Sequence, residues 1–364
     1  MTGATGWASF AGRVATDAVE CVDVLEQPER LETGTWFVVA DFEGRARAWR
    51  FNQVRDASRE PAGAGPDGTG PAGTWHGPAS DTWTTSMDQV TYEAAVERVR
   101  EYVREGEVYQ ANICRVLSAP LPGSVGGTAS AEPDARALAA RLAAGNPAPH
   151  AAAVHVPAAS GLDPVWVVSA SPELYLSLAD GPDGPVVESG PIKGTARTPD
   201  GLTDKDRAEN VMITDLVRND LQTVCRPGTV EVTSLLAVEE HPGLVHLVSR
   251  VRGTLSDDVV RPGELWPRLL AGTFPPGSVS GAPKSSALRI IRELETAPRG
   301  PYCGAVGWVD GGRASLAVGI RTFWWADGVL RFGTGAGITW GSDPTAEWHE
   351  TELKAERLVA LASS

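Results

Sequence analysis

Strand-like segments occur in clusters along this chain, and the helical segments between the clusters follow no regular alternation. Apolar and polar residues alternate in short runs, a period typical of strands with one buried face. Strands are expected at 35–41, 46–51, 106–117, 150–156, 164–169, 173–178, 244–253, 302–309, 314–324 and 329–333. Because successive strands are not each followed by a helix, neighbouring strands are expected to be antiparallel. The pattern therefore predicts an α+β fold with large, mostly antiparallel sheets flanked by helices.

Helical periodicity appears in longer segments. One example is the segment that carries Tyr92, Val96, Val99 and Val103 on a single face. Apolar residues three and four positions apart form one side of a helix. Helices are expected at 91–104, 133–145, 204–224, from 283 onward, and from 345 to the last residue.

Residues 60–73 interrupt this order because they are almost entirely Gly, Pro and Ala. Such a segment lacks side chains for a core and is expected to form a surface loop or linker. At 364 residues the chain is long enough for one large domain or two ordinary ones. We expect a β-rich N-terminal region over 1–84, with its loop at about 58–81 and packed on the main domain, and a catalytic domain over 85–364.

Composition limits the classes of partner. The chain has 32 basic and 46 acidic side chains, a net charge of -14, so a nucleic-acid surface is not expected. There is no basic start followed by an apolar core and no apolar run long enough for a membrane. The cysteines are far apart and form no Cys-x-x-Cys pair, as expected for free thiols in a reducing compartment: Cys21, Cys114, Cys225 and Cys303. These features predict a cytoplasmic protein without nucleic-acid or membrane partners.

Lysine is rare in this chain. Of 32 basic residues only four are lysines: Lys193, Lys205, Lys284 and Lys354. Lys193 lies in the segment Glu-Ser-Gly-Pro-Ile-Lys-Gly-Thr at 188–195, where the glycines and proline predict a tight turn between a strand and a helix. A desolvated lysine can lose its proton and act as a nucleophile, which arginine cannot do. Lys193 is thus either the chemical centre, with the Thr195 hydroxyl beside it, or simply a cation in a turn.

Paired carboxylates lie on the last expected helix. Glu347 and Glu350 are three residues apart and share a face, and Lys354 follows four residues after Glu350. The glycine-rich segment 333–337 precedes them and is expected to form a loop that exposes backbone N–H groups. Mg²⁺ needs only one or two protein carboxylates, so Glu209 with Glu350 would suffice. The alternative is a solvated helix face with a Glu–Lys surface pair.

Three further side chains suit a polar site. Arg321 closes an apolar strand, where its planar guanidinium is either paired or available to a substrate carboxylate. His246 lies in an equally apolar strand and is either a core histidine or part of a site. Glu173 enters a strand directly after a proline, and burial there would raise its pKa and suit it to act as a general acid.

Together these segments resemble the chorismate-utilising enzyme family. The resemblance covers about residues 88–360, with the motifs in the same order, and is weak over the first 80 residues. Its motifs are GEVYQAN at 106–112, SPE at 171–173, PIKGT at 191–195, AENVM at 208–212, DLVRND at 215–220, HLVS at 246–249, FPPGSVSGAPK at 274–284, YCGAVG at 302–307, IRT at 320–322, GAG at 335–337 and EWHET at 347–351.

The resemblance implies a chorismate site with one metal ion. Glu209 and Glu350 would hold Mg²⁺ with Glu347 nearby, and the metal would grip the ring carboxylate of chorismate. His246 would lie near the departing 4-hydroxyl. The residues implied to bind substrate, chiefly the enolpyruvyl carboxylate, are Thr195, Tyr302, Arg321, Gly335, Ala336, Gly337 and Lys354.

Two positions decide the reaction within this family. Anthranilate-forming members have Ala at the position of Lys193, and isochorismate-forming members have Lys at the position of Gln110, where it activates water. Gln110 cannot act as that base, which favours ammonia as the nucleophile. With a lysine in its Pro-Ile-Lys-Gly-Thr segment, the chain resembles the aminodeoxychorismate synthases, whose product is the precursor of 4-aminobenzoate. There Lys193 would attack C2, with Glu173 as acid, before ammonia adds at C4.

The chain contains no Gly-x-Cys-x-Gly nucleophile with a downstream His-x-Glu, so ammonia would come from a separate glutamine amidotransferase or, inefficiently, from solution. Other activities stay open at this point. One is an anthranilate synthase component I-like enzyme or a 2-amino-2-deoxyisochorismate synthase. Another is a non-catalytic chorismate-binding protein of the same fold.

Overall fold

The computed structural model describes residues 6–56, 73–122, 132–241 and 244–364. Most of the expected loop at about 58–81 falls on residues 57–72 and lies outside this description. Within the described part of that loop, Trp75 is buried and its indole N–H donates to the Ala362 carbonyl over 2.8 Å. The segment after residue 72 is therefore attached to the end of the last helix.

A large sheet forms the centre of the molecule, and hydrogen-bonded neighbours run antiparallel, as in the pairs β18–β6, β12–β13 and β2–β4. Its strands are β1 (Trp7–Phe10), β2 (Arg13–Asp23), β3 (Thr35–Ala40), β4 (Ala46–Asp56), β5 (Thr84–Thr85), β6 (Gln110–Pro120), β7 (His150–Val156), β8 (Val165–Ser171), β9 (Leu174–Ala179), β10 (Val186–Gly190), β11 (Ile192–Ala196), β12 (Glu231–His241), β13 (Leu244–Thr254), β14 (Gly281–Ala282), β15 (Ala305–Asp310), β16 (Arg313–Val318), β17 (Thr322–Ala326) and β18 (Val329–Ile338).

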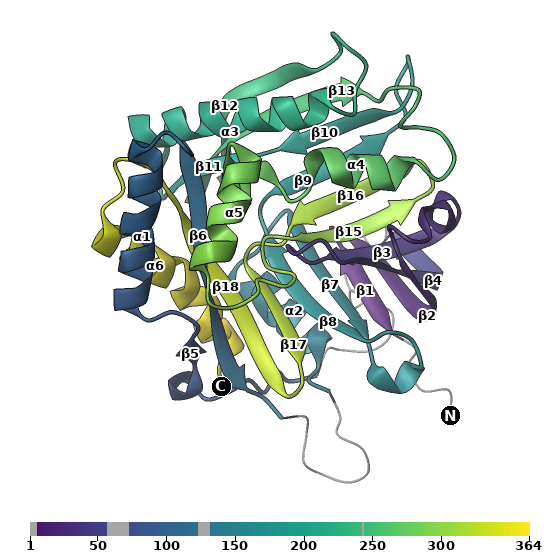
Figure 1. The fold of residues 1–364 in the computed structure, drawn as a ribbon. Helices are drawn as coiled ribbons and strands as arrows, with labels where there is room; N and C mark the ends of the chain where they lie inside the picture. The colour runs from purple at the N-terminus through teal and green to yellow at the C-terminus, as the bar shows by residue number, and fades with distance from the viewer. Residues whose placement is uncertain (1–5, 57–72, 123–131, 242–243) are drawn as a thin grey trace.

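Helices cover this sheet: α1 (Gln89–Arg104), α2 (Ala135–Gly145), α3 (Asp204–Gln222), α4 (Leu265–Thr273), α5 (Lys284–Leu294) and α6 (Pro344–Ala362). Figure 1 shows α1, α5 and α6 along one flank and α3 across the top, beside β12 and β13. This architecture confirms the predicted α+β fold. Among the described residues, none of these helices is long and apolar enough to cross a membrane.

Local sequence explains where the helices begin. The Asp88 carboxylate accepts a hydrogen bond from the Thr91 N–H at the start of α1, and Thr203 and Asp206 form a reciprocal capping box at the start of α3. Asp343 caps α6, with a proline in its first turn. Each helix that was predicted is present, whereas α4 and β12 were not predicted.

The N-terminal strands belong to the same hydrogen-bonded sheet. β1 pairs with β7, and β3 pairs with β15, over six residue pairs from Thr35↔Asp310 to Ala40↔Ala305. A division of the chain between residues 84 and 85 stays a prediction.

Two expectations about turns are wrong. Lys193 does not lie in a turn but in strand β11, where the register against β13 shifts between Ile192 and Thr195 and Gly194 has a φ of 88°. This geometry is a β-bulge, which glycine permits at positive φ. The glycine-rich segment 333–337 is not a loop either, because it lies within β18 and pairs with β6.

Candidate active site

The bulge in β11 fixes Lys193 beside α3. A side chain at Gly194 would place its Cβ 2.8 Å from the Asp206 Cβ, so the glycine lets the strand approach the helix closely. Lys193 is partly buried, and this burial lowers its pKa, although the charge of Glu209 on α3 and that of Glu173 oppose the shift. A larger fraction of its amine is therefore neutral than for an exposed lysine.

Glu173 lies between β8 and β9 and is 4% exposed. Burial raises its pKa to about 7, while the Ser278 hydroxyl and the charge of Lys193 limit the rise. The predicted buried carboxyl with a raised pKa is thus present. Near neutral pH, about half of the Glu173 side chains are protonated and the rest are ionised. Ser278, in the segment after α4, was not singled out from the sequence.

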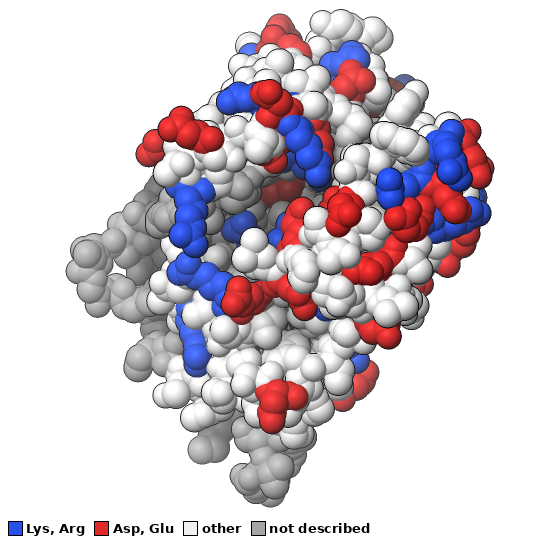
Figure 2. Space-filling view, turned by 90° about the vertical axis from the view of Figure 1, so that its left-hand side faces the viewer, with Lys and Arg blue, Asp and Glu red and all other residues white. Residues whose placement is uncertain are grey.

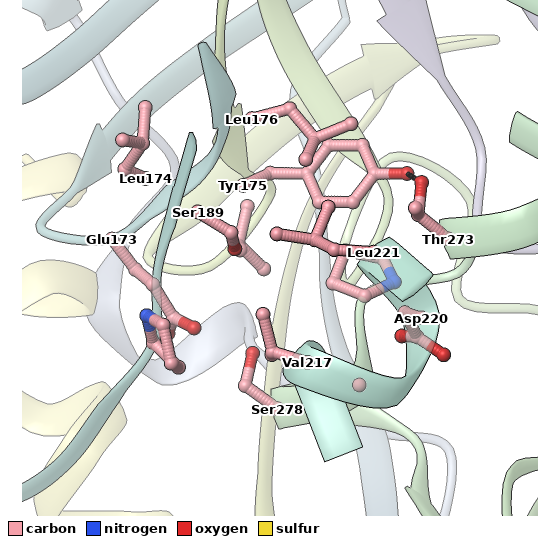
Figure 3. Close-up of a pocket in the computed structure, with 14 residues that line it drawn as sticks. Glu173, Leu174, Tyr175, Leu176, Ser189, Val217, Asp220, Leu221, Thr273 and Ser278 are labelled. Carbon is pink, nitrogen blue, oxygen red and sulfur yellow. Dashed lines mark hydrogen bonds between the residues drawn. The ribbon is translucent and has the colours of Figure 1, made fainter. Parts of the chain in front are cut away.

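A small cavity of about 10 Å³, room for one water molecule, lies behind Glu173. Figure 3 shows Glu173 and Asp220 on opposite sides of it, with Ser278 and Val217 between them. Asp220 pairs with the Lys284 ammonium over 2.6 Å, and burial raises the pKa of Asp220 to about 6. Glu173 therefore borders a small cavity with a mixed apolar and polar lining.

Three carboxylates from two helices face a common space. The Lys205 ammonium lies 3.7 Å from a carboxylate oxygen of Glu209 on α3 and 3.8 Å from one of Glu347 on α6. Burial raises the pKa of Glu347, and the nearby charge of Glu350 raises it further. Lys205 thus links Glu209 to Glu347, and Glu350 lies near Glu347, whereas a site shared by Glu209 and Glu350 stays a prediction.

Lys354 connects α6 to the sheet. Its ammonium pairs with Glu350 over 2.6 Å and donates to the Gly335 carbonyl of β18 over 3.0 Å. The Glu–Lys pair that was the alternative interpretation of this helix is thus present together with the carboxylate cluster. Both lysine and carboxylate are about half exposed, so the pair lies at the mouth of the site.

Arg321 provides an available cation. The prediction that Arg321 closes a strand is wrong. The residue lies between β16 and β17, and its backbone is in the left-handed region with a φ of 52°. Its side chain is partly buried, burial lowers its pKa, and it has no hydrogen-bond or ion-pair partner among the residues that the structure describes. A buried guanidinium without a partner is suited to an anionic ligand.

Tyr302 is buried against Gly333 of β18. Its hydroxyl lies 3.9 Å from the Cys114 sulfur, and its ring fills the space above Gly333, where a Cβ would be 2.0 Å from it. Gly335 accommodates Cys114 in the same way, with 2.5 Å to the sulfur. The side chain of Ala336 points to the other face and packs in the α1 core, so only its backbone is available on the Gly335 side.

Gln110 packs against Gly337, where a Cβ would lie 2.1 Å from the Gln110 amide nitrogen. That nitrogen donates to the Asn112 side chain over 3.2 Å, whereas the buried amide oxygen has no partner among the described residues. His246 is buried in β13 opposite Thr195 of β11. The side chain of Thr195 lies outside the part of the structure that is described.

Electrostatic interactions link Lys193 with Glu173, Glu209, Glu350 and Lys354, and the structure adds Lys205 to the predicted residues. Its signal was visible in the sequence, since it is one of four lysines and precedes Glu209 by four residues. Across residues 6–56, 73–122, 132–241 and 244–364, no cluster of three or more His, Cys, Asp or Glu side chains is arranged to hold a metal on its own. The face that carries α1 and α6 is hollowed, and basic and acidic side chains lie together around the hollow (Figure 2).

Comparison with known proteins gives consistent matches. The chain is 36% identical over 286 residues to anthranilate synthase component 1 of Saccharolobus solfataricus, covering 75% of this chain and 62% of that protein. It is 37% identical over 282 residues to aminodeoxychorismate synthase of Streptomyces pristinaespiralis, covering 74% of this chain and 36% of that protein. It therefore spans less than two thirds of either relative.

Solved structures share the fold. Anthranilate synthase component I from Streptococcus pneumoniae superposes with a TM-score of 0.74 at 21% identity, covering 97% of this chain and 92% of that one. MenF, the menaquinone-specific isochorismate synthase from Escherichia coli, superposes with a TM-score of 0.76 at 18% identity, covering 100% and 89%. A sequence profile for chorismate binding enzymes matches residues 3–360. The chain thus belongs to the chorismate binding enzyme family.

Proposed function

We propose that this chain is the component I subunit of an aminodeoxychorismate synthase, which converts chorismate and ammonia to 4-amino-4-deoxychorismate. The observation that carries the proposal is Lys193, an amine held in a strand bulge with a lowered pKa and with Glu173 and Glu209 beside it. A nucleophilic lysine needs a neutral amine, and burial at this position favours the neutral form.

Two displacements account for the reaction. The neutral Lys193 amine attacks C2 of the ring, the double bond shifts, and the 4-hydroxyl leaves as water with a proton from Glu173. Ammonia then attacks C4, the double bond shifts back, and the C2–N bond breaks. The Lys193 nitrogen passes one proton to Glu173 as the adduct forms and regains one from the incoming ammonia as it departs, so both groups are restored, one ammonia enters and one water leaves. The raised pKa of Glu173, about 7, leaves a protonated fraction for the first step.

Gln110 supports ammonia rather than water as the nucleophile. Its side chain cannot deprotonate water, and its buried amide oxygen lacks a partner among the described residues. An incoming N–H group would satisfy that acceptor. Arg321, which also lacks a partner within the described part of the chain, would bind a substrate carboxylate through its planar fork.

Carboxylates on α3 and α6 are the candidate ligands of a divalent cation, which would need substrate oxygens or water as well. Glu209, Glu347 and Glu350 supply oxygen ligands of the kind that Mg²⁺ prefers, and the Lys205 ammonium lies 3.7 Å from Glu209 and 3.8 Å from Glu347. We propose that Glu209 and Glu350 hold Mg²⁺ with Glu347 nearby. When bound, the ion would supply positive charge for the ring carboxylate. Lys193 and Glu173 carry out the proton and bond changes.

A second candidate is an anthranilate synthase component I activity. Several of the curated relatives matched over about three quarters of this chain carry that name. Residue 193 opposes it, because anthranilate-forming members have alanine there and lack the lysine adduct. In either case we propose a separate glutamine amidotransferase as the source of ammonia.

The experiment is to incubate the chain with chorismate, Mg²⁺ and ammonium chloride above pH 8 and to identify the product by mass and ultraviolet spectra. Aminodeoxychorismate as the main product is expected, and fluorescent anthranilate or isochorismate would overturn the proposal. Lys193→Ala should lower kcat by at least about a hundredfold, consistent with loss of a nucleophile. Arg197→Ala, at an exposed position in the same segment, is the matched control. Equal turnover of the two variants would exclude the covalent step.

A further inference from the structure

Lys205 differs from Lys284 and Lys354 in the way it contacts carboxylates. Lys284 and Lys354 each contact one carboxylate at 2.6 Å, whereas Lys205 lies between two carboxylates at 3.7 and 3.8 Å. The two acceptors, Glu209 and Glu347, come from different helices. Lys205 therefore occupies a shared space without closing a tight ion pair with either residue.

The environment makes this ammonium easy to displace. The Lys205 side chain is 58% exposed, while those of Glu209 and Glu347 are 19% and 5% exposed. The acceptors are thus held by the fold, and the cation is attached through a flexible four-carbon chain that can extend into solvent. Moving Lys205 away requires no change in the core.

The choice of lysine is informative in a chain that uses arginine for most positive charges. Only four of its 32 basic residues are lysines. An arginine fork at this position could bind both carboxylates through several hydrogen bonds and hold them firmly. A lysine balances their charge but offers a single ammonium that another cation can replace.

We propose that Lys205 is a displaceable counter-ion that balances Glu209 and Glu347 until a divalent cation binds at Glu209 and Glu350, and that it thereby sets the affinity of the site for Mg²⁺. This inference rests on the proposed metal site and extends it, because it assigns a role to a residue outside the set of ligands. Lys205 is a positioning residue, since it balances the carboxylates before the cation arrives and leaves when the cation binds.

Two substitutions should move the affinity in opposite directions. Lys205→Met removes the competing charge and keeps the apolar chain, so Mg²⁺ should bind roughly fivefold more tightly, given charge repulsion reduced by solvent and salt. Lys205→Arg keeps the charge and adds the fork, so Mg²⁺ should bind roughly fivefold more weakly.

Calorimetric titration of Mg²⁺ into the protein with saturating chorismate, no ammonia and constant ionic strength measures this affinity without turnover. Arg207→Met is the matched control because it removes the same charge from the same helix at an exposed position about 200° around the axis. Its affinity should equal that of the wild type. Glu209→Gln should weaken binding strongly, which locates the measured site.

The outcomes separate the two levels of the proposal. If the wild type does not bind Mg²⁺, or if Glu209→Gln binds as the wild type does, the metal site is refuted and this inference falls with it. If Mg²⁺ binding depends on Glu209, the metal site stands. In that case, a Lys205→Met affinity for Mg²⁺ equal to that of Arg207→Met, or weaker, refutes the counter-ion role. An unchanged or tighter affinity in Lys205→Arg would also refute that role.

Discussion

Substitution of Ser278 tests how the acid is tuned. Burial raises the pKa of Glu173 to about 7, and the Ser278 hydroxyl lowers it by donating a hydrogen bond that favours the carboxylate. The proposed reaction needs the protonated carboxyl together with a neutral Lys193, so one limb of the dependence of kcat on pH should report the pKa of Glu173 near 7. With that pKa, only about a tenth of Glu173 is protonated one pH unit higher.

Ser278→Ala removes the hydrogen bond, so the pKa of Glu173 should rise further. A hydrogen bond to a charged group contributes about 1.5 kcal/mol or more, and one pKa unit corresponds to about 1.4 kcal/mol. The limb of the kcat–pH profile that reports Glu173 should therefore move about one unit toward higher pH. The sign follows because the lost interaction stabilised the charged form.

The assay is kcat between pH 6 and 9 at saturating chorismate and a fixed concentration of neutral ammonia. Ser189→Ala is the control, since Ser189 lines the same cavity but is not among the groups that shift Glu173. Its profile should match that of the wild type. A Ser278→Ala profile that is unmoved, or moved toward lower pH, would refute the reasoning.

Two further predictions concern packing. Lys284→Met would leave the Asp220 carboxylate buried without its 2.6 Å partner, and the free energy of unfolding in urea should fall by about 3 kcal/mol, with partial recovery when Asp220→Asn is added. An unchanged urea midpoint would contradict the view that this pair is buried. Gly337→Ala places a Cβ 2.1 Å from the Gln110 amide and should lower both Tm and kcat/KM, whereas Gly341→Ala, with no atom within 4 Å, should change neither.

Helices and buried strands were predictable from the sequence because the spacing of their apolar residues indicates which face is buried. The apolar face of α1, from Tyr92 to Val99, was predicted and is buried. The site carboxylates were also predictable, because Glu347 and Glu350 share a helix face and Glu173 enters an apolar strand after a proline. These predictions depended on local spacing.

The predictions that were wrong or missing depended on tertiary contacts. Glycines in β18 were predicted as a loop, yet each of Gly333, Gly335 and Gly337 makes room for a side chain from another element. β12 was not predicted, and its apolar residues Leu235 and Val238 are largely exposed. A single sequence does not show which side chain will fill the space beside a glycine. A glycine-rich strand such as β18 is therefore predicted to be a loop.

Polar anchors fix the two helices that carry Glu209 and Glu350, candidate ligands about 140 residues apart in the sequence. On α3, the Asn210 amide next to Glu209 donates to the Leu247 carbonyl of β13 over 2.9 Å and accepts from the Ser249 hydroxyl over 2.5 Å. On α6, the Thr351 carbonyl next to Glu350 accepts from the Thr334 hydroxyl of β18 over 2.8 Å. Directional hydrogen bonds fix the rotation of each helix, which apolar packing alone leaves less strictly defined. The residue adjacent to each candidate ligand is thus tied to the sheet, so the sheet fixes the position of each helix, and Lys205 on α3 adds a contact to Glu347 on α6.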